Sequence, residues 1–175
     1  MDDYGRLIEP GTLRMERLLP APIERVWRYL VEPEKRARWL AGGTMGAAAG
    51  DSFELHFENA KLGGTPPERY RDYDRLHVQT SRVIRIEAPR LLVISWSHGE
   101  RDASEVSFEL TPRDAQTHLR LTHRLLATRS DTLSVSGGWH THLDLLGDLL
   151  AGRTPRPFWT TLQTVEAAYD QRIPA

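Results

Sequence analysis

The sequence has no cysteine among its 175 residues. This absence excludes disulfide bonds, thiolate nucleophiles and metal sites built on thiolate ligands. Neither sign of charge is in excess, because 23 basic residues stand against 24 acidic ones and leave a net charge of -1. A chain without a basic surplus lacks the positive stripe that releases counterions from a phosphate backbone. We therefore expect no nucleic-acid partner.

Long apolar runs and common catalytic motifs are also missing. No run approaches the roughly 18 apolar residues that a membrane span needs, and the acidic opening MDDYGRLIEP has no apolar stretch of the signal-peptide kind. Neither G-x-S-x-G nor H-E-x-x-H occurs. The sequence thus predicts a cytoplasmic protein with no membrane partner, no metal, no cofactor and no assigned catalytic residue. Whether it is an enzyme stays open, with a non-catalytic role favoured.

The most informative stretch present is 137–152, GGWHTHLDLLGDLLAG. At 100° per residue it predicts one amphipathic helix that begins after two glycines and is capped by Gly152. His140, Asp144 and Asp148 fall on the polar face. The apolar face consists of Trp139, Leu143, Leu146, Leu149 and Leu150, and it needs a large partner. His142 is a polar residue inside that apolar face, which makes it the first indication of a site.

Strand patterns fill the middle of the chain. Residues 12–19, TLRMERLL, alternate as an edge or barrel strand, and residues 52–57 alternate in the same way. Residues 59–75 lack periodicity and predict a long loop, either a lid or binding loop or a disordered segment. From residue 76 onward, apolar residues recur with period two, which indicates an antiparallel meander with one wet and one buried face. These positions are Ile84 and Ile86; Leu92, Ile94 and Trp96; Val106, Phe108 and Leu110; and Leu119, Leu121, His123 and Leu125.

Short helical stripes at 23–30 and 34–40 follow prolines, and a last stripe spans 158–169. The order of elements predicts an α+β fold in which a curved antiparallel sheet of six to seven strands wraps around the long helix. A curved sheet that grips a helix leaves an apolar pocket between them. We expect a single domain over residues 1–175, with a core at 12–152 and a C-terminal helical extension at 153–175.

The chain also resembles a known family, the START-like or Bet v 1-like helix-grip superfamily. The likeness is to its branch similar to the C-terminal domain of the activator of heat-shock protein 90 ATPase, and the tail after residue 155 is similar to an extension of some bacterial members. The resemblance implies the helix-grip fold. It implies function only broadly, because the superfamily includes lipid carriers, metabolite binders, cyclases and chaperone cofactors. The matching segments are 17–40, 86–96, 104–112, 118–126 and 137–152.

Eight residues are the candidate ligand-binding cavity. His123 and His142 would give it a polar group to bind a ligand. The alternative interpretation, which is the commoner one, is that each is a core histidine bonded to a neighbour and that the aromatic residues are plain core. His140 and His142 cannot chelate a metal together, since residues two apart on a helix point in opposite directions. Arg17, on the apolar side of its strand, either binds an acidic ligand group or carries its charge to the rim. The eight are Phe53, Phe57, Trp96, Phe108, His123, Trp139, His142 and Leu146.

Three functions remain as hypotheses. The first is non-catalytic binding of a small hydrophobic molecule in the cavity between sheet and helix. The second is an interaction or chaperone-cofactor module with a protein partner, or a homodimer. The third is a cyclase or hydrolase that uses His142 or His123 as acid or base.

Overall fold

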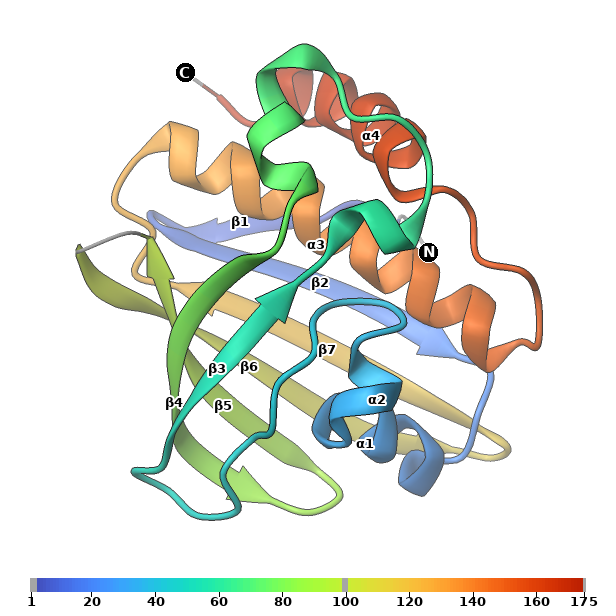
Figure 1. Ribbon diagram of the computed structural model, residues 1–175. Coiled ribbons are helices and arrows are strands. Elements are labelled where there is room, and N and C mark those ends of the chain that lie inside the picture. The colour runs from blue at the N-terminus through green and yellow to red at the C-terminus, as the bar shows by residue number, and fades with distance from the viewer. Residues whose placement is uncertain (1–2, 99–100, 175) are drawn as a thin grey trace.

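The structure is a computed structural model, and it describes residues 3–98 and 101–174 (Figure 1). The strands are β1 (Arg6–Glu9), β2 (Thr12–Leu19), β3 (Ser52–Phe57), β4 (His77–Glu87), β5 (Leu91–His98), β6 (Arg101–Arg113) and β7 (Gln116–Arg124). The α-helices are α1 (Ile23–Val31), α2 (Pro33–Arg36), α3 (Arg129–Leu150) and α4 (Phe158–Arg172), and two 3-10 helices are η1 (Asn59–Leu62) and η2 (Glu68–Asp74).

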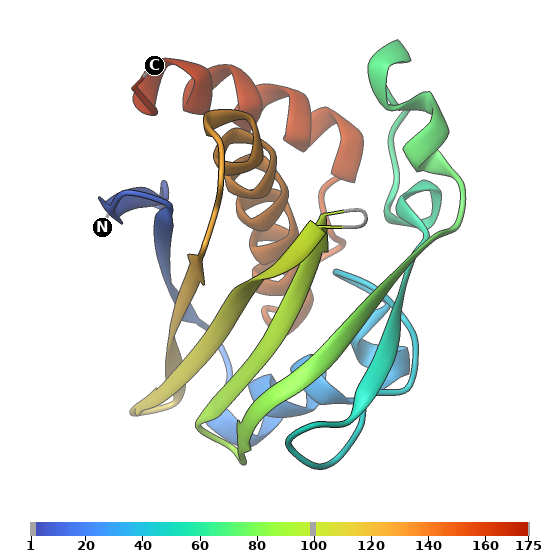
Figure 2. The same ribbon diagram turned by 90° about the vertical axis from the view of Figure 1, so that its left-hand side faces the viewer.

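The strands form one antiparallel sheet in the order β1-β2-β7-β6-β5-β4-β3. The predicted α+β architecture is confirmed, with seven strands and a long helix on the sheet. Figure 2 shows α3 lying between the two ends of the curved sheet, with α4 above it and α1 near its far end. Residues 12–19 were predicted to form an edge or barrel strand. β2 is not an edge strand, because β1 pairs with its outer side.

α3 begins at Arg129, ten residues before Trp139, where the sequence pattern placed its start. Thr128 caps it: the Thr128 hydroxyl accepts from the Asp131 N–H, and the Asp131 carboxylate accepts in return. The two glycines therefore lie inside the helix, and a Cβ on Gly137 would come within 2.9 Å of Glu166 Cγ on α4. Gly137 permits this close helix contact. Gly152, at φ +72°, confirms the predicted left-handed cap.

The alternation in β4 is interrupted by a bulge. Register shifts between Val83 and Arg85, so Ile84 turns outward and is 42% exposed, contrary to the prediction that it faces the core. The inward residues before the bulge are Gln79, Ser81 and Val83, all buried. Leu125 was also expected inside, but it lies beyond the end of β7 and is 64% exposed. The inner face of β4 is therefore more polar than the pattern indicated.

The second short helix is shorter than predicted, because α2 ends at Arg36 and the chain continues in turns. The Arg36 guanidinium, buried in the core, donates to the carbonyls of Leu30 and Ala41, and burial lowers its pKa to about 10. Trp39 is fully buried and donates its indole N–H to the Tyr29 carbonyl at 2.9 Å. This corner closes one end of the core.

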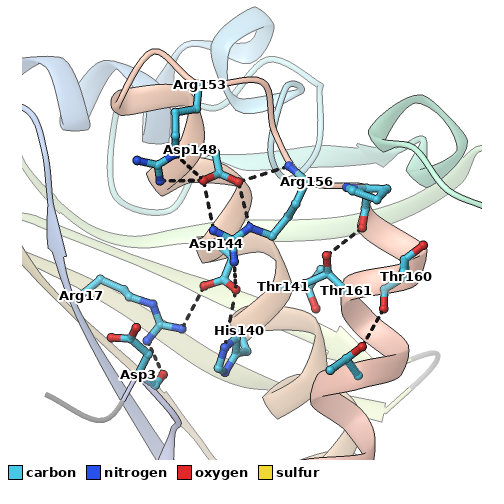
Figure 3. Close-up of polar contacts among 12 residues, drawn as sticks. Asp3, Arg17, His140, Thr141, Asp144, Asp148, Arg153, Arg156, Thr160 and Thr161 are labelled. Carbon is cyan, nitrogen blue, oxygen red and sulfur yellow. Dashed lines mark hydrogen bonds and ion pairs between the residues drawn. The ribbon is translucent and has the colours of Figure 1, made fainter.

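The polar face of α3 is covered by charged residues, which we call the ionic cluster (Figure 3). Arg17 does not reach the rim as predicted: its side chain is 8% exposed, 3.6 Å from Asp144 and bonded to the Asp3 carbonyl, because the N-terminal segment lies over it. The Asp148 carboxylate on α3 accepts from two arginines that follow the helix, from Arg153 at 2.7 Å and from Arg156 at 2.8 Å. The members are Arg17, His140, Asp144, Asp148, Arg153 and Arg156.

Candidate functional site: an interior pocket

A pocket of about 510 Å³ lies between the sheet and α3, bordered by α4 and by the 59–75 segment. We call it the interior pocket. Its volume is in the range of about 300 to 1,000 Å³ that small-molecule sites occupy. Its wall is rich in aromatic side chains, and the rim residues Tyr73 and His77 are exposed to solvent. The aromatic wall residues are Phe57, Tyr70, Tyr73, Trp96, Trp139, Phe158 and Trp159.

The structure divides the eight predicted cavity residues into two groups. Phe57, Trp96, Trp139 and His142 line the interior pocket. Phe53, Phe108, His123 and Leu146 do not line it and are buried in the core. Phe108 and His123 lie against Trp139, at 5.5 and 6.3 Å between ring centroids, and so support the wall from outside.

His123 is a core histidine that holds the wall in place. Its Nδ1 accepts from the Trp139 indole N–H at 2.9 Å, and its Nε2 lies 2.7 Å from the Ser104 hydroxyl. Because an indole nitrogen can only donate, Nδ1 carries no hydrogen and the proton sits on Nε2. The Ser104 hydroxyl in turn donates to the Trp96 carbonyl at 2.9 Å. This chain of bonds fixes Trp139 against β5, β6 and β7.

His142 differs from His123 in facing the interior pocket. Its Nδ1 lies 2.5 Å from the Trp39 carbonyl oxygen and therefore donates, which leaves Nε2 as the acceptor. Within the described part of the chain no group bonds to Nε2. Burial lowers the pKa of His142 to about 4, opposed by the Trp39 bond. At neutral pH the pocket thus contains an uncharged imidazole with an available lone pair.

Two further polar groups reach the wall without a protein partner. Gln79 on β4 is 9% exposed, and its buried side-chain nitrogen has no hydrogen-bond partner. The buried side-chain oxygen of Asn59 has none either. A buried polar atom without a partner costs about 1 to 3 kcal/mol, and folded proteins rarely retain one without a reason. A ligand polar group is such a reason.

The aromatic walls, by contrast, have polar ends that are paired within the protein. Trp159 donates its indole N–H to Asp74 at 2.7 Å, and its ring stacks on Tyr70 at 5.7 Å. The Tyr70 hydroxyl donates to Glu166, which also accepts from Arg69. The 59–75 segment, with η1 and η2, therefore packs against α4 and forms an ordered wall. Of the two predicted alternatives, a loop that borders a site or a disordered segment, the structure agrees with the first. Its rings offer flat apolar surface to the pocket.

Gly138 leaves space where a side chain would stand. It lies in the interior of α3 and lines the pocket, and a Cβ built on it would meet nothing within 4 Å. Glycine inside a helix costs about 1 kcal/mol relative to alanine. The helix carries this destabilising residue at a point where any side chain would project toward the pocket.

The residues that the sequence interpretation missed belong to two places. Phe158 and Leu162 belong to the predicted last helical stripe, but the pattern gave no partner for it, and in the structure α4 packs on α3 and these two residues line the pocket. Gln79 was hidden because the interpretation of β4 rested on Ile84 and Ile86. The signal that could have indicated it is Gln79 itself, a polar residue that alternates with exposed positions and therefore faces the core.

Other kinds of site find little support among residues 3–98 and 101–174. No group of three or more His, Asp or Glu side chains there is arranged to hold a metal ion. In the same residues, no helix has the length and apolar character that crossing a membrane would require.

Comparison with known proteins shows which family the chain is similar to. A Bordetella parapertussis protein with a solution structure is 48% identical over 99% of this chain and 92% of its own, with a TM-score of 0.85. The CalU16 protein of Micromonospora echinospora is 23% identical over 98% of this chain and 96% of its own (TM-score 0.69), and an Enterococcus faecalis protein of unknown function is 19% identical over 98% and 90% (TM-score 0.68). These two show the fold alone.

A search of curated proteins found no match. Residues 20–151 match the family described as Activator of Hsp90 ATPase homolog 1-like protein, and the match covers the two short helices, β3 to β7 and all of α3. The resemblance noted in the sequence is thereby confirmed: the chain belongs to the Activator of Hsp90 ATPase homolog 1-like family of helix-grip proteins.

Proposed function

We propose that this protein binds a small, mostly apolar molecule in the interior pocket and that binding, rather than catalysis, is its activity. The observation that carries the proposal is the pairing of an aromatic wall with buried polar atoms that lack protein partners, on Gln79 and Asn59. Buried side-chain atoms without a partner also occur at Arg14, Arg17, Ser81 and Ser136, but those of Gln79 and Asn59 belong to residues that line the pocket. A ligand would satisfy them when it fills the pocket.

The acid–base alternative is less well supported by the geometry. It calls on His142 or His123, and of these His142 alone lines the pocket, while His123 is bonded to Trp139 and Ser104 behind the wall. The low pKa of His142 also makes it a weak base at neutral pH. Binding needs neither a second histidine nor a charged one.

Native mass spectrometry of the protein purified from the organism that encodes it tests the proposal. We expect a bound molecule that organic solvent releases. The variant Gly138→Leu fills the pocket from α3 and should lose the adduct. Gly147→Leu is the matched control, since Gly147 lies on the same helix, has nothing within 4 Å of its Cβ position and does not line the pocket.

The two variants also guard against a trivial loss of folding. Both replace a helical glycine by a good helix former, so α3 should be at least as stable in each. An adduct that survives in Gly138→Leu, or its absence from every preparation of the wild-type protein, would contradict the proposal.

A further inference from the structure

Among the residues whose side chains the structure describes, the wall of the interior pocket has one carboxylate, Glu166, and no lysine or arginine. Its two histidines are His77, at the exposed rim, and His142, whose pKa burial lowers to about 4. Glu166 accepts from Arg69 and Tyr70, so Arg69 is already engaged outside the wall. Moving a carboxylate or phosphate from water into such a site leaves its charge unpaired, which is strongly unfavourable.

Gln79 sets one requirement for the ligand. Its buried side-chain nitrogen has two hydrogens and no partner, and the residue belongs to the pocket wall. The amide nitrogen and oxygen exchange places if the group is rotated by 180°. As the side chain stands, the nitrogen donates and suits a ligand carbonyl or hydroxyl oxygen. In the rotated orientation the amide oxygen would accept from a ligand hydroxyl, and a hydrocarbon satisfies neither orientation.

His142 sets a second requirement. Its Nδ1–H is used by the Trp39 carbonyl, and its ring lies 4.8 Å from Phe158 at the pocket wall. The remaining ring nitrogen is an acceptor and suits a hydroxyl or N–H of the ligand. The two side chains come from opposite sides of the pocket, Gln79 from β4 in the sheet and His142 from α3.

From these groups we infer the chemical class of the ligand: it is an uncharged hydroxy-carbonyl compound, with the carbonyl received by Gln79 and the hydroxyl by His142, and it is neither a fatty acid nor a phosphorylated lipid. This inference rests on the proposed function. It assigns Gln79 and His142 as the residues that determine specificity, while the aromatic wall supplies affinity that does not depend on polarity.

Four naphthalenes test the inference by calorimetry or tryptophan quenching at pH 7. 6-Hydroxy-2-acetylnaphthalene has both polar groups, 6-methoxy-2-acetylnaphthalene lacks the donor, 6-hydroxy-2-naphthoate replaces the ketone by a charge, and 2-ethylnaphthalene has neither polar group. We expect the hydroxy-ketone to bind about tenfold more tightly than the methoxy-ketone, a difference of about 1.4 kcal/mol. The carboxylate should bind more weakly than the hydrocarbon.

The variant Gln79→Met removes the amide and keeps the size of the side chain. It should weaken the hydroxy-ketone about tenfold and leave 2-ethylnaphthalene unchanged. The free energy of unfolding of the variant should not fall, because the substitution removes a buried amide nitrogen that has no hydrogen-bond partner. Gln116→Met makes the same change at an exposed position at the start of β7 and serves as control.

The outcomes separate the inference from the proposed function. If the four compounds bind with equal affinity, or the carboxylate binds best, the pocket binds ligands but the inferred class is wrong. A normal affinity of Gln79→Met for the hydroxy-ketone also overturns it. If no compound binds, including the hydrocarbon, the proposed function and the inference fail together.

Discussion

Polar residues lie on two sides of α3, and the two sides differ in how fully these residues are hydrogen-bonded within the protein. In the ionic cluster, Asp148 accepts bonds from Arg153 and Arg156, and Arg156 also reaches Asp144 at 3.0 Å. In the interior pocket, His142 has one of its ring nitrogens bonded and the Gln79 amide nitrogen has no bond. Both regions lie against the same helix.

The difference indicates what each region is for. A buried polar group that the protein pairs with its own residues contributes to holding elements in place, and the ionic cluster joins α3 to β2 and to the segment that leads into α4. A buried polar group without a partner carries a cost that folding alone does not recover. Arg17 in the ionic cluster also has side-chain nitrogens without a hydrogen-bond partner, but its guanidinium is ion-paired with Asp144 and bonded to the Asp3 carbonyl. The first region is therefore structural, and the second, which borders the pocket, is where we expect a ligand.

The largest expected effect separates packed core from pocket wall. Trp39→Ala should cost about 3 to 5 kcal/mol in the free energy of unfolding, because the side chain is fully buried in the core. Trp96→Ala should cost about 1 to 2 kcal/mol, since Trp96 is half-buried and already borders open space. Urea unfolding measures both. Equal losses would mean that the pocket wall is packed as tightly as the core.

The next effect is the pH dependence that His142 gives to stability. The unfolded chain protonates this imidazole below pH 6.5, but the folded protein does so only near pH 4. The contribution is therefore complete above pH 6.5 and is lost as the pH falls toward 4. The difference of about 2.5 between the two pKa values is worth on the order of 3 kcal/mol.

His142→Asn tests this assignment, because its amide can still donate to the Trp39 carbonyl while having no proton to gain. Unfolding free energies measured from pH 4 to 7 should vary less in His142→Asn than in the wild-type protein. An unaltered slope in His142→Asn would show that other groups cause the acid sensitivity.

A smaller loss is expected on the structural side of α3. Asp148→Asn should cost about 2 kcal/mol, less than a fully buried ion pair because its arginine partners are partly exposed. The Arg156 hydrogen bonds lower the pKa of Asp148, so its contribution is present above about pH 4 and disappears in stronger acid. Ligand affinity should not change. A loss of affinity equal to that of Gln79→Met would break the division between the two regions.

The smallest expected effect is a gain in stability. Gly138→Ala and Gly147→Ala should each stabilise the protein by about 1 kcal/mol, because both positions are helical and have room for a Cβ. Thermal unfolding measures the gain. Gly137→Ala is the contrast, since its Cβ would lie 2.9 Å from Glu166 Cγ, and we expect no gain there. A loss at Gly138 would mean that the pocket is narrower than the structure shows.

The predicted fold was largely accessible from the sequence because its signals are local. Period-two alternation in β5, β6 and β7 and the Trp139–Leu150 stripe of α3 each follow from which residues face the core. The start of α3 was misplaced because Gly137 and Gly138 were interpreted as a boundary. Their role depends on contact with α4 and on the pocket, and neither is visible in a local pattern.

The site was less accessible because it is built from distant segments. Phe57, Trp96, Trp139 and His142 were predicted from facing directions, and all four line the pocket. Tyr70 and Trp159, by contrast, lie 89 positions apart in the sequence and come together through a stacking contact that no periodicity encodes. The lack of a partner at Gln79 is a property of the whole fold. It becomes apparent only when every neighbour is in place.

The central claim is that ligand binding acts on the pocket side of α3 and not on the ionic cluster. A titration of isotope-labelled protein with 6-hydroxy-2-acetylnaphthalene, followed by NMR, tests it most directly. We predict that the Gln79 side-chain amide, the Trp139 indole N–H and the Gly138 backbone amide shift together, while the Arg153 and Arg156 side-chain signals stay in place. Shifts centred on the arginines, or no shift at Gln79, would contradict the account.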